Sequence, residues 1–114
     1  MRFGGLLGWV AARDRCLALT PAAHLVTITS MAEDDFVRTF AGARDLWTGG
    51  NDRAVEGTYV WSDGEPFAYA NWMPNEPNDT GHVENCIVLR GTVAPGGLLD
   101  DHSCAATFGF VCER

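Results

Sequence analysis

The stretch EPNDTGHVENC, Glu76–Cys86, decides how the rest of the chain is interpreted. It contains three acids, two carboxamides, a proline and a glycine, and it ends at a cysteine. Calcium takes about six to eight oxygen ligands, which carboxylate and amide side chains supply. A proline between two oxygen-bearing residues can turn both side chains to one side, particularly where its peptide bond is cis. The stretch therefore predicts a calcium site on a loop.

Composition and charge narrow the class of protein. The chain has 114 residues, 46% of them hydrophobic and 20% charged, which predicts a single globular domain over residues 1–114. Its net charge of -7 argues against nucleic acid and anionic membrane surfaces as partners. No run approaches the roughly 20 apolar residues of a membrane span, so no membrane insertion is expected.

The four cysteines are an even number for a small domain and predict two disulfides formed in an oxidising compartment. No C-x-x-C pair is present, which disfavours zinc and thioredoxin-like sites. Their positions alone allow three pairings among Cys16, Cys86, Cys104 and Cys112. The protein is expected to be secreted or extracellular, with an export signal that this chain does not contain.

Two helices are predicted in the first half of the chain. The first has one apolar stripe at helical spacing, formed by Trp9, Ala12, Cys16 and Leu19. The second begins at Ser30 and Glu33, which have the spacing of a capping box, and Gly42 is expected to end it. Its buried face is expected to consist of Phe36, Val37 and Phe40.

Short strands dominate the rest of the chain. The candidates are His24–Ile28, Leu46–Thr48, Tyr59–Trp61, Cys86–Leu89 and Phe108–Cys112. Between Asp63 and Asn85 the pattern is irregular, and a loop of about 20 residues in a compact domain is normally functional. Helices followed by strands and loops indicate an α+β fold.

Short motifs along nearly the whole chain resemble, in order and spacing, the C-type lectin-like domain. The motifs are Trp9…Ala12…Cys16, Leu25–Ile28, Trp47–Gly50, Trp61–Gly64, Asn71–Trp72, Glu76–Asn78, Glu84–Cys86, Cys104 and Phe110–Glu113. The resemblance implies a double-loop fold with two helices, two small antiparallel sheets and a long irregular loop that binds calcium and sugar. It also implies the disulfides Cys16–Cys112 and Cys86–Cys104.

The resemblance further implies two calcium sites. The principal calcium would be bound by Glu76, Asn78, Glu84, Asp100 and Asp101. An auxiliary calcium would be bound by Asp52, Glu56, Asp79, Glu84 and Asn85. Two neighbouring sugar hydroxyls would complete the principal shell, in contact with Glu76, Asn78, Glu84 and Asp100.

The order Glu76-Pro77-Asn78 goes, in this family, with mannose-type hydroxyls, so glycans of the mannose, glucose or fucose type are the expected partners. Asp100 stands where the family has an Asn, and it lacks the amide N–H that would donate to the second hydroxyl. The site would also hold four carboxylates, those of Glu76, Glu84, Asp100 and Asp101, against two positive charges. This departure favours calcium binding and weakens the expected contact with sugar.

Two other functions compete with a lectin. A lectin-like domain that binds calcium and a protein or other non-sugar ligand is the alternative, favoured by Asp100 and by Leu99, where a Trp is common. Glu76 and Glu84 would be the acid and nucleophile of a glycosidase, but cation binding already explains them, and no enzyme is expected. Because single-site sugar binding is weak, the domain is expected to be part of an oligomer or a larger multidomain protein.

Overall fold

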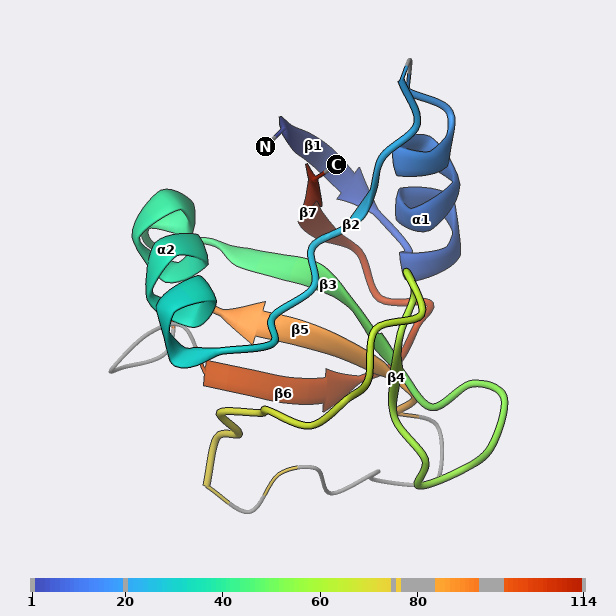
Figure 1. Ribbon diagram of the computed structural model, residues 1–114. Helices are drawn as coiled ribbons and strands as arrows, with labels where there is room; N and C mark the ends of the chain where they lie inside the picture. Colours follow the sequence, from blue (N-terminus) through green and yellow to red (C-terminus); the bar gives the residue numbers. More distant parts are fainter. Residues whose placement is uncertain (1, 20, 75, 77–83, 93–97, 114) are drawn as a thin grey trace.

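The computed structural model describes residues 2–19, 21–74, 76, 84–92 and 98–113. Within these ranges lie two helices and seven strands, and the strands form one sheet (Figure 1). The helices are α1 (Trp9–Leu17) and α2 (Met31–Ala41). The strands are β1 (Arg2–Leu7), β2 (His24–Leu25), β3 (Asp45–Asn51), β4 (Val60–Trp61), β5 (Cys86–Arg90), β6 (Leu98–His102) and β7 (Phe108–Glu113).

The sheet has the order β1-β7-β3-β5-β6, with β2 paired to β7 and β4 paired to β3. Strand β7 pairs antiparallel with β1 and β2 but parallel with β3, so the sheet is mixed. The two small antiparallel sheets that were expected are joined into one, because β7 pairs with β1 and β2 and also with β3. The α+β class and the two expected helices are confirmed.

The two helices cover opposite faces of the sheet. On one face the predicted stripe of α1 packs on strand residues, in a cluster that includes Trp9, Ala12, Cys16, Trp47, Val88 and Phe110. On the other face α2 packs in a cluster that includes Val37, Ala41, Leu46, Ile87, Leu89 and Val111. Neighbouring strand residues point to opposite faces, which is why Ile87 and Val88 belong to different clusters.

The buried face of α2 differs from the prediction. Val37 is buried, but Phe36 is 60% exposed and Phe40 39% exposed, and their rings stack on the outer surface. Asp34 takes the inward position instead and is only 4% exposed. The orientation of α2 therefore depends on a buried polar residue, which the hydrophobic pattern of the helix does not predict.

Asp34 fastens the long loop after β4 to α2. Its Oδ2 accepts hydrogen bonds from the Tyr69 hydroxyl at 2.9 Å and from Asn71 Nδ2 at 3.1 Å. The backbone of Leu99 in β6 then donates to the Asn71 carbonyl and accepts from the amide of Met73, both at 2.8 Å. The loop is thereby held along β6, the edge strand beneath which it runs in Figure 1.

Replacing Asp34 by Ala removes the acceptor that Tyr69 and Asn71 share, and we expect it to lower the free energy of unfolding by about 1–3 kcal/mol. Asp35→Ala is a matched control, because it removes only an exposed ion pair with Arg38 and should cost less than about 1 kcal/mol. Urea unfolding of both variants measures the difference. Equal losses would show that Asp34 does not hold the loop.

Candidate functional site

Three acids gather where the long loop meets β6. The loop turns at Met73, whose carbonyl accepts a hydrogen bond from the Glu76 amide at 3.0 Å. Asp100 and Asp101 are consecutive residues of β6 and are 9% and 0% exposed. Glu76, Asp100 and Asp101 each place one carboxylate oxygen within 4.8 Å of the others. Two segments far apart in the sequence therefore present their oxygens to one small volume.

The acids of this group perturb one another. Burial raises the pKa of Glu76 to about 8, and the neighbouring carboxylates of Asp101 and Asp100 add to the effect. The ordinary pKa of a glutamate is 4.5, so Glu76 holds its proton to a much higher pH. That proton relieves a repulsion between carboxylates that a cation would also relieve. The donor atoms are all carboxylate oxygens, which fits a hard cation such as calcium.

The raised pKa of Glu76 gives a pH dependence with a definite sign. Its stabilising contribution is complete below the ordinary pKa of 4.5 and is lost as the pH rises through about 8, because ionisation is unfavourable in the fold. In a chelating buffer, the melting temperature of the wild type should fall relative to Glu76→Gln across this window. The glutamine supplies an N–H donor in place of the carboxyl O–H and carries no charge. A difference between the two proteins that stays constant with pH would contradict this.

A second group of oxygens lies where the segment after β3 returns to β5. The Asp52 amide donates to the Asn85 carbonyl at 3.0 Å, and the carboxylates of Asp52 and Glu56 both accept from the Gly57 amide, at 2.9 and 3.1 Å. Oδ1 of Asp52 and Oδ1 of Asn85 are buried without a hydrogen-bond partner among the described residues. Such buried acceptors are uncommon and costly, so these two oxygens fit a role as cation ligands.

The predicted ligands are placed as follows. The structure brings together Glu76, Asp100 and Asp101 of the principal set, and Asp52, Glu56 and Asn85 of the auxiliary set. Glu84 directly precedes Asn85 and does not join the three-acid group within the described ranges. Asn78 and Asp79 lie outside the described residues.

Both predicted disulfides are confirmed. Cys16–Cys112 joins α1 to β7, and Cys86–Cys104 joins the start of β5 to the segment that follows β6. The second disulfide therefore ties together the strands that carry, or adjoin, both groups of oxygens.

Sequence reasoning missed Arg90. Its Nη1 donates to Oδ2 of Asp100 at 3.0 Å, so one of the three clustered acids is also half of an ion pair. The pair forms across the β5–β6 ladder, and β6 was not predicted. The run Cys86–Leu89 before Arg90 did indicate a strand. Had β6 been predicted as its partner, the register of the two strands would have revealed the pair.

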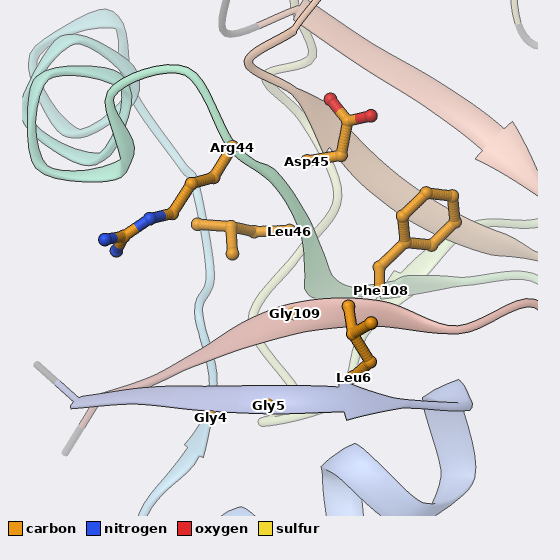
Figure 2. Close-up of a pocket in the computed structure, with 8 residues that line it drawn as sticks. All are labelled: Gly4, Gly5, Leu6, Arg44, Asp45, Leu46, Phe108 and Gly109. Atoms are coloured by element: carbon orange, nitrogen blue, oxygen red, sulfur yellow. The ribbon is translucent and has the colours of Figure 1, made fainter.

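A separate apolar hollow of about 610 Å³ lies over β1, β7 and β3 (Figure 2). Glycines of β1 and β7 line it together with Leu6, Leu46 and Phe108, and none of the predicted ligands that the structure describes does. Neither helix in the described part of the chain has the length and apolarity that crossing a membrane requires.

The fold and the two oxygen groups define a disulfide-bonded α+β binding domain whose site lies beside a long loop. The family model described as Lectin C-type domain matches residues 6–114. Over 107 residues the chain is 39% identical to the low affinity immunoglobulin epsilon Fc receptor of Mus musculus, an alignment that covers 93% of this chain and 30% of the receptor. The chain belongs to the C-type lectin domain family.

Solved structures agree with this assignment. The C-type carbohydrate-recognition domain of cow CD23, solved in the presence of a GlcNAc2Man3 oligosaccharide, is 39% identical with a TM-score of 0.88, and 98% of this chain and 84% of that chain are covered. A calcium-independent type II antifreeze protein is 28% identical with a TM-score of 0.84, and 96% and 82% are covered.

The similarity concerns this domain rather than whole relatives, because the chain spans 30%, 31% and 63% of three curated relatives that it matches. The family is one of non-enzymatic lectin domains, and its fold also serves proteins named for other functions, such as the antifreeze protein, so this chain is a binding domain.

Proposed function

We propose that this chain is a calcium-dependent lectin domain that binds sugars of the mannose, glucose or fucose type. The observation that carries the proposal is the meeting of Glu76 with Asp100 and Asp101, because the three come from the two segments that would share the principal calcium. The oligosaccharide in the similar cow domain supports a sugar as the ligand.

In this proposal Glu76, Asn78, Glu84, Asp100 and Asp101 hold the principal calcium. The bound ion supplies coordination positions for two neighbouring hydroxyls of the sugar. The protein orients that sugar through hydrogen bonds, because a carboxylate accepts from a hydroxyl and an amide donates to it. Glu76 and Asn78 serve one hydroxyl, and Glu84 and residue 100 serve the other.

The auxiliary calcium is proposed to be held by Asp52, Glu56, Asp79, Glu84 and Asn85. The buried Oδ1 atoms of Asp52 and Asn85 support it, since each is an acceptor without a hydrogen-bond partner among the described residues. Glu84 would belong to both sites, so the auxiliary ion would help to fix the loop segment that supplies the principal one.

A secreted or extracellular location is proposed from the two disulfides, which persist in oxidising compartments. Several copies acting together would raise the avidity of a weak single site, so assembly into an oligomer or a multidomain protein is part of the proposal.

Retention on mannose-agarose in calcium, with release by a chelator, is the expected result for the wild type. Calcium at a hundred times its Kd should stabilise the fold by about 2.7 kcal/mol. Glu76→Gln should weaken calcium binding in calorimetry by about tenfold or more, since it removes a charged ligand. Asp35→Asn, an acid outside both groups, is the matched control and should bind like the wild type.

A non-sugar ligand is the second candidate, and the likeness to an antifreeze protein favours it. Its signature would be a melting temperature raised by calcium without retention on mannose-, glucose- or fucose-bearing resin. A melting temperature that calcium does not change, with no heat of calcium binding, would overturn the calcium proposal itself.

Asp52→Asn tests the auxiliary ion separately. It replaces a buried charged ligand by a neutral one, so calorimetry is expected to show one calcium per chain where the wild type binds two. Mannose retention should persist at raised calcium concentration, because the principal ligands are intact. Asp14→Asn, an exposed acid on α1, serves as the control, and unchanged stoichiometry in both variants would contradict the auxiliary site.

A further inference from the structure

Arg90 lies in an ion network that crosses three strands. Its Nη1 donates to Oδ2 of Asp100 at 3.0 Å, and its Nε lies 3.4 Å from Oδ2 of Asp45. The three side chains are partly buried, with 23% of Arg90, 13% of Asp100 and 16% of Asp45 exposed. Water screens such pairs less than exposed ones. The charges of the network can therefore influence the binding of a cation beside Asp100.

The strand register explains the contacts. Asp45 of β3 lies directly opposite Arg90 of β5, and Asp100 of β6 lies opposite Val88. Arg90 and Asp100 are thus diagonal neighbours across the ladder, a separation that a long side chain spans. The guanidinium sits between an acid on each side.

Asp45 is itself held in place on the far side of Arg90. Its carboxylate accepts hydrogen bonds from the amide of Thr92 at 3.0 Å and from its hydroxyl at 2.7 Å. The turn that carries Thr92 packs tightly, since a Cβ on Gly91 would clash with the Arg44 carbonyl oxygen. Figure 2 shows the Asp45 carboxylate and the Arg44 guanidinium pointing in different directions. Arg90 is therefore paired with a carboxylate that hydrogen bonds from Thr92 hold in place.

The ion pair with Arg90 limits the oxygens of Asp100 that are available to a cation. One oxygen of Asp100 is engaged by Arg90, while a carboxylate oxygen of Asp100 also lies within 4.8 Å of the Glu76 and Asp101 oxygens. The guanidinium offsets the charge that distinguishes Asp100 from a neutral amide, and it places N–H donors beside the carboxylate. The pair thus reproduces the oxygen ligand and the N–H donor of an asparagine.

We propose that Arg90 is a specificity-determining residue of the lectin site, which restrains Asp100 to a one-oxygen ligand and thereby keeps coordination positions open for sugar hydroxyls. The inference rests on the proposed calcium-dependent sugar binding and assigns a role to a residue outside the calcium ligands. Without Arg90, Asp100 is free to bind calcium through both oxygens, which favours the ion and disfavours the sugar.

The test is a double-mutant cycle of wild type, Arg90→Met, Asp100→Asn and the double variant, with calcium and mannose affinities measured by calorimetry. Arg90→Met should bind calcium more tightly and mannose, in saturating calcium, about tenfold more weakly. Asp100→Asn supplies the background in which residue 100 is an amide, and its own calcium and mannose affinities are the reference for the double variant. In the Asp100→Asn background, Arg90→Met should have little further effect on either ligand.

A second measurement does not depend on the metal. In a chelating buffer, Arg90→Met should lower the melting temperature more when residue 100 is Asp than when it is Asn. Two results would overturn the proposal: melting-temperature shifts of the two substitutions that simply add, or an equal loss of mannose affinity with Asp and with Asn at residue 100. Either would show that Arg90 has only a general structural role.

The outcomes separate this inference from the function on which it rests. Wild-type protein that binds calcium and mannose while Arg90→Met leaves both affinities unchanged would overturn the role of Arg90 alone. Wild-type protein that binds no calcium would overturn the proposed function and the inference together. If Arg90→Met does not fold, Arg90→Gln is measured in both backgrounds instead, and an equal loss of mannose affinity in the two would overturn the proposal.

Discussion

The backbone of Leu99 is the point on which the site depends. It pairs with Leu89 inside the sheet, and its amide and carbonyl bond to Asn71 and Met73 of the long loop. These bonds place the loop beside β6 and so bring Glu76 to the acids that follow Leu99. A Trp is common at this position in the family, yet the contacts that hold the loop are made by the main chain. Leucine therefore preserves the architecture as long as it stays buried, and it is 1% exposed.

Gathering acids in this way lowers the stability of the fold, and the consequence differs from one acid to the next. Glu76 has a raised pKa, Asp100 is paired with Arg90, and Asp52 keeps one oxygen buried without a partner among the described residues. Unfavourable groups of this kind concentrate where a ligand is to be bound, because the ligand removes the penalty. The core around the site is buried, and the disulfides join α1 to β7 and the start of β5 to the segment that follows β6. This supplies the stability that the acidic site removes.

How much the sequence predicted depends on how local each signal is. The stripe of Trp9, Ala12 and Cys16 and the end of α2 at Gly42, which has a φ of 63°, follow from a few neighbouring residues and were predicted correctly. The exposure of Phe36 and Phe40 was not predicted, because the residues that hydrogen-bond Asp34 and turn it inward lie in the long loop. Strand β6 was missed because consecutive acids do not look like a strand. The candidate oxygen ligands were predicted from a family motif rather than from periodicity.

Asp100 shows why a motif position has to be interpreted together with its cross-strand neighbour. Taken alone, an aspartate in place of an asparagine adds a charge and removes a donor, which argues against a sugar site. Its diagonal neighbour Arg90 offsets the charge and brings donors of its own, and Asp45 and Thr92 keep the guanidinium in place. The same aspartate beside an apolar residue would form a different site, one suited to the ion alone. The ligand preference is therefore encoded in a pair of residues on adjacent strands, and a motif confined to one strand contains only half of it.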